Sequence, residues 1–297
     1  MSDDLKLPLE TGSLEKSGWH YTNATGLLGI LETGEIWAAS PRFVNDTSEM
    51  TYGLDKLREY WGEGKLFDGL TKDDKKFISD ALNASEFEIQ IDSTFFISTS
   101  KNGDNLSQWR NYSGSDGFAI ELDLEVDLCH ENLVSRKDGL GLLEGLIFSG
   151  WYDVSYDENS LIKRFLEIIR GFRQIRLLEE LKNTQTKLDF AKVILMSNIL
   201  KFKHPAFLHE EEIRFVIAAN DSVKPKYIES RGLIRPYLNL RTCTKTFAEA
   251  KLPLPIKSIK CGPEMKNSEV TMIKEMLSSY GYNEQQVTKS DIPFIDK

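Results

Sequence analysis

The sequence predicts an α+β fold in which residues 1–297 form a single domain. Strand-like segments occur near both ends of the chain, and the longest helical patterns lie between them. The chain is 40% hydrophobic and 28% charged, with 16 Phe and 5 Trp, so it has enough apolar side chains for a sizeable core. It contains no internal repeat, low-complexity tract or Pro/Gly-rich linker. We therefore expect strands from both ends to share one sheet, with a helical insertion at about residues 158–203.

The expected strands are short segments that are aromatic and β-branched or that alternate apolar and polar residues. The first, residues 19–22, is aromatic and has little room before a turn. In residues 94–100, alternation places Ser98 and Ser100 on one face. The remaining expected strands are residues 36–39, 117–123, 146–156, 213–218, 233–238 and 256–261, with a last extended piece that ends near residue 295.

The first expected helix follows the first strand directly. Thr22 or Asn23 can cap its N-terminus, and Gly34 ends it where a left-handed residue is needed. Apolar residues at positions 27, 28, 30 and 31 form one face. The other expected helices are residues 49–61, 72–82, 106–112, 160–181, 188–202 and 268–280.

The net charge and the lack of long apolar stretches bear on partners and location. A formal net charge of −9 disfavours long-range attraction to nucleic acid or to an anionic membrane. No stretch reaches the roughly 18 apolar residues of a membrane span, and the first residues are acidic where a signal peptide is basic. We expect a cytoplasmic protein with no membrane partner. A local basic patch, formed by arginines of residues 164–176 with Lys201 and Lys203, is more simply interpreted as a solvated face.

Cysteine and histidine usage argues against disulfide and metal chemistry. Cys129, Cys243 and Cys261 are widely spaced, which predicts neither a disulfide framework nor a pair of close thiolates and fits a reduced compartment. The four histidines lack the spacing of a helical zinc pair. A Walker-type phosphate loop, a dinucleotide glycine fingerprint, a zincin helix and a Gly-x-Ser-x-Gly elbow are all absent. We therefore expect no metal.

Two segments carry polar groups that a strand would expose in a cleft. The first, His20-Tyr21-Thr22, places a histidine on an aromatic strand, where it either binds a ligand hydroxyl or is purely structural. The second, Ser98-Thr99-Ser100, ends a strand in hydroxyls that together can hold a carboxylate or a ligand amide.

The most informative segment is residues 210–217. Alternation puts Glu210, Glu212 and Arg214 on one face of the strand and Glu211 on the other. Unpaired charges are costly away from water, so the charged face must be solvated, paired or functional. The alternative without a function is an edge strand with a ladder of salt bridges.

Taken in order, these segments resemble a bacterial protein family. The residues that carry the resemblance are His20-Tyr21-Thr22, the helix that ends at Gly34, the loop Arg42-Phe43-Val44-Asn45-Asp46 with Glu49, Gln108-Trp109, Glu210-x-Glu212-x-Arg214 and Ser290-Asp291-Ile292-Pro293-Phe294. They are similar to the family catalogued as domain of unknown function 2971, and the resemblance covers most of the chain. The opening strand and helix also resemble the start of ADP-ribosyltransferase-like folds, which include DNA-modifying toxins and RNA phosphotransferases.

The second resemblance implies a fold and a reaction. The fold would be an ADP-ribosyltransferase-like split sheet, mixed or antiparallel, and the substrate would be NAD. In such folds a first-strand His or Arg holds the nicotinamide ribose, a Ser-Thr-Ser strand supports the site, and a Glu at the start of a later strand is catalytic, often as Glu-x-Glu. The resemblance therefore implies that Glu212 and Glu210 are catalytic. The residues implied to bind the nucleotide are His20, Tyr21, Thr22, Arg42, Asn45, Phe96, Ser98, Ser100, Trp109 and Arg214.

These roles make chemical sense. Departure of nicotinamide leaves an oxocarbenium-like ribose that Glu212 would stabilise, while Glu210 would position or deprotonate the acceptor. Arg42 would bind the pyrophosphate through its forked donors, and Tyr21 or Phe96 would flank the nicotinamide ring. The chain departs from a His-Tyr-Glu pattern in lacking a second tyrosine motif. The roles require the side chains of His20, Ser98 and Glu212 to surround one cleft, within about 10 Å of one another.

The sequence leaves several functions open. The leading hypothesis is an NAD-dependent ADP-ribosyltransferase-like enzyme, a toxin or phage-defence effector, that acts on a protein, nucleic-acid or small acceptor. The acidic net charge slightly disfavours nucleic acid. The alternatives are an NAD hydrolase with no macromolecular acceptor, a non-catalytic nucleotide-binding or sensing module in which Arg42 and Arg214 hold phosphates, and a purely structural role for these residues. The oligomeric state is not predicted.

Overall fold

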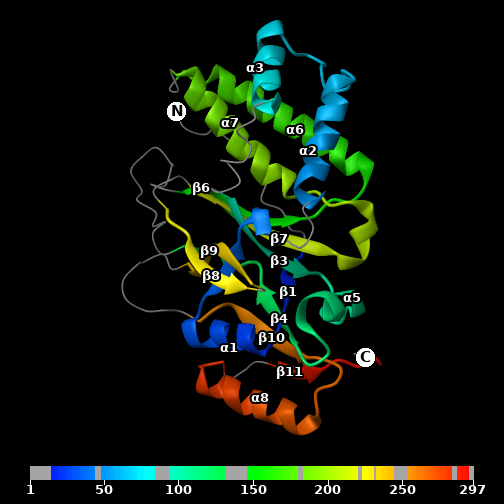
Figure 1. Cartoon of the computed structure of the whole chain (residues 1–297), viewed down its shortest axis with the longest axis vertical. Helices are drawn as coiled ribbons and strands as arrows, with labels where there is room; N and C mark the ends of the chain where they lie inside the picture. The colour runs from blue at the N-terminus through cyan, green and yellow to red at the C-terminus, as the bar shows by residue number, and fades with distance from the viewer. Residues whose placement is uncertain are drawn as a thin grey trace.

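The structure, a computed structural model, describes residues 15–43, 48–83, 94–130, 146–179, 183–219, 223–230, 232–243, 253–282 and 286–293. Within these residues it is an α+β fold built on an 11-stranded sheet, which confirms the α+β class and the mixed, mostly antiparallel sheet. Every strand pair is antiparallel except β10 with β11. Figure 1 shows the sheet in the middle of the molecule, with one group of helices above it and α1 and α8 below.

Every expected helix and strand that falls on described residues is present, and β5 and β8 are found in addition; the end of the last extended piece, near residue 295, lies outside the described residues. The strands are β1 (Ser17–Thr22), β2 (Ile36–Ala39), β3 (Thr94–Ser100), β4 (Phe118–Asp123), β5 (Leu128–Cys129), β6 (Leu146–Asp153), β7 (Glu212–Ala219), β8 (Lys226–Ser230), β9 (Leu233–Thr242), β10 (Ile256–Cys261) and β11 (Gln286–Lys289). The helices are α1 (Ala24–Thr33), α2 (Ser48–Gly62), α3 (Lys72–Asn83), α5 (Leu106–Gln108), α6 (Glu158–Leu177), α7 (Thr184–Ile199) and α8 (Asn267–Ser279). Three short helical turns are η1 (Pro41–Phe43), η2 (Trp109–Ser113) and η3 (Pro205–Glu210).

The helix α1 begins and ends as its sequence predicts. The Asn23 side chain accepts a hydrogen bond from the backbone N–H of Gly26 at 2.9 Å, which makes it the N-cap. Gly34 follows the helix in the left-handed region, with φ 65°. Leu27, Ile30 and Leu31 are buried, whereas Leu28, expected on the same face, is 40% exposed.

The sheet divides at β3. One edge of β3 pairs with β7 over its whole length. The other edge is shared, because Trp19 of β1 pairs with Ser100 and Ala39 of β2 pairs with Phe96. One arm continues from β1 through β4, β10 and β11, and the other continues from β2 through β9 to β8 and β5. The single backbone pairing between β1 and β3 leaves neighbouring carbonyl groups of β3 available to side chains.

The two faces of β7 enter different cores. Ile213, Phe215 and Ile217 lie in the main core with α1 and α8, as their alternation predicts. Val216 and Ala218 lie on the opposite face, in a smaller cluster below the end of α7. Glu212 and Arg214 share this second face, so the charged side of β7 points toward the helices.

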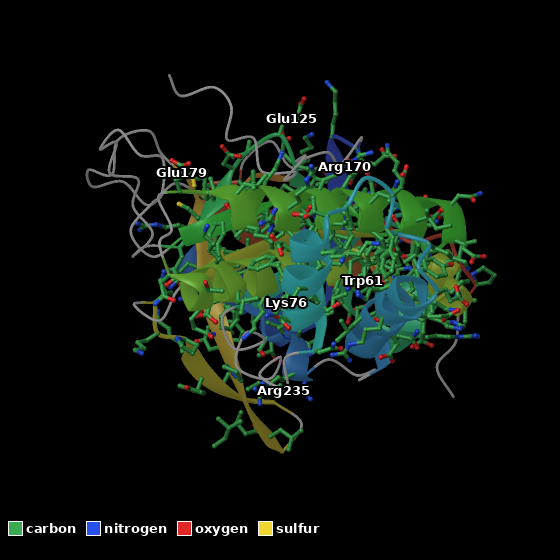
Figure 2. The ribbon with its side chains drawn as sticks, turned by 90° about the horizontal axis from the view of Figure 1, so that it is seen from above. Trp61, Lys76, Glu125, Arg170, Glu179 and Arg235 are labelled. Carbon is green, nitrogen blue, oxygen red and sulfur yellow. The ribbon has the colours of Figure 1, made fainter. Side chains whose placement is uncertain are left out.

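Helices α2, α3, α6 and α7 form a layer with an apolar core of their own, on the side of the sheet that carries β6 and β7 (Figure 1). The helices α6 and α7 fall within residues 158–203, where long helices were expected, and α2 and α3, from earlier in the chain, pack with them. Seen from above, these helices cross the sheet, while the hairpin of β8 and β9 near Arg235 extends beyond them (Figure 2). No helix in the described part of the chain is long and apolar enough to cross a membrane.

The structure corrects three expectations. Lys201 and Lys203 do not lie on a solvated face: they are 2% and 1% exposed, because α7 ends at Ile199 and the chain then turns inward beneath the helices. The strand β7 is not an edge strand, since β3 and β6 pair with its two sides. Cys129 ends β5 and Cys243 directly follows β9, the partner strand of β5, so two of the three widely spaced cysteines lie diagonally opposite each other on neighbouring strands.

Substitution of two glycines, one crowded by backbone and one in open space, tests how closely the chain packs after β10. A Cβ on Gly262, just after β10, would lie 2.3 Å from the carbonyl oxygen of Ser115, whereas a Cβ on Gly29 in α1 would meet nothing within 4 Å. We expect Gly262→Ala to lower the free energy of unfolding by roughly 1–3 kcal/mol through overpacking. The control Gly29→Ala should raise it by about 0.5–1 kcal/mol, because alanine favours a helix. Urea unfolding followed by circular dichroism measures both, and equal effects would contradict the close backbone approach.

Candidate functional site

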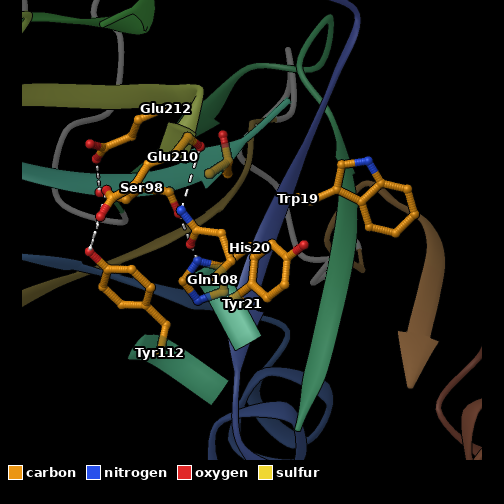
Figure 3. A pocket seen from close by; sticks show the side chains of 9 residues that line it. Trp19, His20, Tyr21, Ser98, Gln108, Tyr112, Glu210 and Glu212 are labelled. Carbon is orange, nitrogen blue, oxygen red and sulfur yellow. Dashed lines mark hydrogen bonds between the residues drawn. The ribbon is translucent and has the colours of Figure 1, made fainter. Parts of the chain in front are cut away.

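A small pocket of about 70 Å³ opens where β1, β3, the start of β7 and the α5–η2 segment meet. In Figure 3 Glu210 and Glu212 lie together on one side of the view, and the Trp19 ring lies on the other. The pocket is lined by Trp19, His20, Tyr21, Ser98, Thr99, Gln108, Tyr112, Glu210 and Glu212.

Ser98 joins His20 to Glu212. The Nδ1 atom of His20 lies 3.0 Å from the Ser98 carbonyl oxygen, and the Ser98 hydroxyl donates to Oε1 of Glu212 at 2.5 Å. Burial lowers the pKa of His20, against the smaller opposing effect of its bond to Ser98. The imidazole is therefore neutral near pH 7. Because a carbonyl oxygen only accepts, Nδ1 carries the proton and Nε2 is left as a hydrogen-bond acceptor.

Hydrogen-bond donors surround both oxygens of the Glu212 carboxylate. Arg214 donates to its two oxygens from Nε and Nη2, at 2.7 and 2.8 Å. Lys203 donates to Oε2 at 3.1 Å, in addition to the bond from Ser98. Burial by itself would raise the pKa of Glu212, but the Arg214 and Lys203 charges and the hydrogen bonds lower it to about 2. A carboxylate has about four lone-pair sites, so these four donors occupy its accepting capacity.

Glu210 is held more loosely. Lys203 donates to its Oε2 at 2.6 Å, and the Tyr112 hydroxyl lies 3.3 Å from Oε1. Both contacts leave lone pairs on the carboxylate beside the pocket. Between the two acids, Glu211 adopts the left-handed conformation, with φ 46°. This conformation is unfavourable for a residue with a side chain, and here it joins η3 to β7 so that one ammonium group reaches both glutamates.

Lys203 comes from the segment that follows α7. The backbone of this segment is tied to the chain after β6, since Ser155 N–H donates to the Lys201 carbonyl at 2.8 Å and Lys203 N–H donates to the Ser155 carbonyl at 3.2 Å. The carbonyl of Leu200 accepts from Nη1 of Arg214 at 2.8 Å. The helical layer therefore supplies two of the partners that hold the charged face of β7.

The structure brings together some of the residues expected from the sequence. His20, Tyr21, Ser98, Glu210 and Glu212 line the pocket. Four others lie behind it: Ser100 donates to the Glu210 carbonyl at 2.8 Å, Phe96 stacks on Arg214 at 4.8 Å, Trp109 packs edge-on against Tyr21 at 4.9 Å, and Arg214 holds Glu212.

The other expected residues are elsewhere. Thr22 is half-buried beside the start of α1 and does not line the pocket. Arg42 is exposed in η1 and does not line it either. Asn45 lies outside the described residues. Arg214 directs its guanidinium to Glu212 and Leu200, which favours a positioning role over the expected contact with a phosphate.

Sequence reasoning missed Lys203 and Tyr112. Lys203 follows a helical pattern and lies two residues before Pro205, and nothing in its neighbours predicts that it turns inward. Tyr112 stands in the segment after Gln108-Trp109, which the family resemblance singled out, but its own spacing carries no signal. No group of three or more His, Cys, Asp and Glu that could hold a metal ion occurs among the described residues.

The low pKa of Glu212 predicts a contribution to acid stability. Its pKa is about 2 in the folded chain against an ordinary value of 4.5, which corresponds to about 3 kcal/mol. This stability is present above pH 4.5 and is lost as the pH falls toward 2. We expect Glu212→Gln to be less stable than wild type near pH 7 and the gap to narrow below pH 4.5. Urea unfolding at a series of pH values tests this, and a gap independent of pH would contradict it.

Lys203 and Lys201 form a matched pair for a second test. Lys203→Met removes a buried cation from two carboxylates, so the pKa of Glu212 should rise and the stability should fall by roughly 3–5 kcal/mol. Lys201 bonds to Asn198 and lies over the Tyr152 ring, and burial lowers its pKa to about 7. Lys201→Met should therefore be nearly neutral or stabilising. Carbon-13 NMR of the glutamate carboxylates and urea unfolding provide the measurements. Equal losses in both variants would assign the effect to packing.

Residues 108–215 match the model of a family described as "Protein of unknown function (DUF2971)". No curated protein and no solved structure matches the chain. The matched part contains Tyr112, Lys203, Glu210 and Glu212, whereas His20 and Ser98 lie before it. The match supports, over this part of the chain, the resemblance to the domain of unknown function 2971 family that the sequence motifs indicate.

Proposed function

We propose that this protein is an NAD-dependent ADP-ribosyltransferase-like enzyme that cleaves the bond between nicotinamide and ribose. The observation that supports it is the continuous link from His20 through Ser98 to Glu212 around one pocket, with Glu210 beside it. These are the residue types, in the chain order, that the resemblance to such folds implies. The division of the sheet at β3 is compatible with a split-sheet fold of that kind.

The two glutamates suit different tasks. Glu212 keeps its negative charge at any pH near neutrality, as a group that stabilises an oxocarbenium-like ribose must. Its lone pairs are occupied, so a ribose hydroxyl that binds to it would take the place of the Ser98 hydroxyl. Glu210 has accepting capacity left and is the group suited to take a proton from an acceptor hydroxyl or water.

The size and lining of the pocket suit one end of a dinucleotide. A volume of about 70 Å³ is room for about two waters at the roughly 30 Å³ that each takes in the liquid, so one ribose hydroxyl or the edge of a ring would fit in it. Nε2 of His20 would accept a hydrogen bond from a ribose hydroxyl. The Tyr21 hydroxyl is already engaged with the backbone of Asn102 and Asn105, so its ring is the part offered to nicotinamide. The rest of NAD would lie outside, where exposed Arg42 remains the proposed pyrophosphate partner.

A toxin or phage-defence effector could use this reaction with either of two acceptors. Transfer of ADP-ribose would modify an acceptor, and transfer to water would deplete NAD. The pocket geometry is common to both. A sensing module that binds the nucleotide without cleaving it would use the same pocket with Glu212 as a structural anion.

Nicotinamide release and calorimetry with NAD test the proposal. We expect wild-type protein to bind NAD and release nicotinamide. Glu212→Gln should lower the rate by roughly 10²–10³-fold, because one electrostatic partner of the transition state is lost. Glu211→Gln is the matched control, since Glu211 is exposed and points away from the pocket, and it should retain the wild-type rate.

The outcomes separate the candidate functions. Release that needs an added protein or nucleic acid indicates a transferase, and release without one indicates a hydrolase. Binding with no release in wild type and Glu212→Gln alike would leave a sensing module. Absence of NAD binding by a folded protein would overturn the proposal.

A further inference from the structure

Two of the three cysteines lie next to each other where β5 pairs with the end of β9, away from the pocket. Leu128 pairs with Thr242 and Cys129 with Arg241, and the backbone N–H of Cys243 donates to the Asp127 carbonyl at 2.9 Å. Opposite residues of an antiparallel pair point to the same face, and so do residues two apart along a strand. Asp127, Cys129, Arg241 and Cys243 therefore form a square on one face, in which the two thiols are diagonal neighbours.

The surroundings of the pair favour thiol chemistry. The hydrogen bond from Cys243 lowers the pKa of Cys129, and Arg241 acts in the same direction, while burial and Asp127 oppose them. Cys129 is buried and Cys243 is partly exposed, so solvent reaches the pair from the Cys243 side. The third cysteine differs, because Cys261 is buried in β10 and burial raises its pKa to about 11.

We propose that Cys129 and Cys243 form a redox-active pair that a two-electron oxidant of the peroxide class converts into an intramolecular disulfide. The Cys129 thiolate attacks one oxygen of hydrogen peroxide, the O–O bond breaks and hydroxide leaves, which oxidises the sulfur to a sulfenic acid. The Cys243 sulfur then displaces the hydroxyl group, so that the S–S bond forms as the S–O bond breaks. The thiol proton leaves with the hydroxyl as water. In sum, two thiols and one peroxide give one disulfide and two waters.

The strand pair can accommodate this bond. Diagonal neighbours in a sheet lie about 7–8 Å apart, slightly more than the Cα separation that a disulfide spans, so closure needs a small shift of β5. The strand β5 is two residues long and, among the described strands, pairs with β9 alone, so few backbone hydrogen bonds oppose that shift, although Leu128 packs in the main core. The bond would enclose residues 129–243 in one covalent loop, which includes β6, α6, α7, η3, β7, β8 and β9. It does not depend on the proposed enzymatic function, because β2 and β9 separate the pair from β3.

Peroxide treatment of the folded, purified protein tests the pair. Protein reduced with dithiothreitol should show three thiols on denaturation, and protein treated with a few equivalents of hydrogen peroxide should show one. The intact mass should fall by about two hydrogens, as the stoichiometry above requires. Peptide mapping should place the bond between Cys129 and Cys243, and dithiothreitol should restore all three thiols. The oxidised protein should melt several degrees higher, because the bond restricts the unfolded chain.

Single substitutions supply the controls. Cys261→Ser should leave formation of the bond unchanged, whereas Cys129→Ser and Cys243→Ser should each abolish it. Arg241→Met should slow the reaction, since a cation that favours the thiolate is lost. Retention of all three thiols, a bond that involves Cys261, or bonds between chains would each overturn the proposal. Failure of the nicotinamide-release assay has no bearing on it, so the two proposals stand or fall separately.

Discussion

The buried ion pair of Glu212 and Arg214 is the interaction on which both the architecture and the candidate site depend. Moving a charge out of water costs several kcal/mol unless a partner and hydrogen bonds compensate for it. Here the two side chains face each other from the same side of β7 and are 4% and 1% exposed. The bidentate geometry, the added bond from Ser98 and the Lys203 ammonium provide that compensation. Together with Glu210, these side chains form a cluster of two carboxylates and two cations whose formal charges cancel. Removal of any one of the four would leave a buried charge without its partner.

This cluster also ties separate parts of the chain together. Ser98 belongs to β3, Lys203 and the Leu200 carbonyl follow α7, and the Tyr156 hydroxyl, beyond β6, accepts from the backbone N–H of Glu212. The sheet and the helical layer therefore meet through polar contacts as well as through apolar packing. A change in the position of α7 would act directly on the carboxylates beside the pocket. Stability and the proposed chemistry thus rest on the same few side chains, with Glu211 held in an unfavourable backbone conformation between them.

Local patterns in the sequence were sufficient for the elements and for part of the site. The capped helix α1, the alternation of Ile213, Phe215 and Ile217, and the shared face of Glu212 and Arg214 all follow from backbone geometry over a few residues. The helical layer was predicted only in part, because α2 and α3 join it through contacts with residues about a hundred positions later in the chain. β5 went unrecognised because a strand of two residues has no periodicity to detect, and β8 because its two apolar residues, Tyr227 and Ile228, are adjacent rather than alternating.

The sequence by itself determined the α+β class, the two ends of α1 at its capping residues, and the polar motifs at His20, Ser98 and Glu212, because these depend on neighbours in the chain. The tertiary structure alone decided that Lys203 is a buried partner of two glutamates, that Arg214 holds Glu212, and that Cys129 meets Cys243. The physical reason is the same in each case. Burial and pairing of a charged or reactive group depend on strands and helices from distant parts of the chain, and the free energy of those contacts has no local signature in the residues that make them.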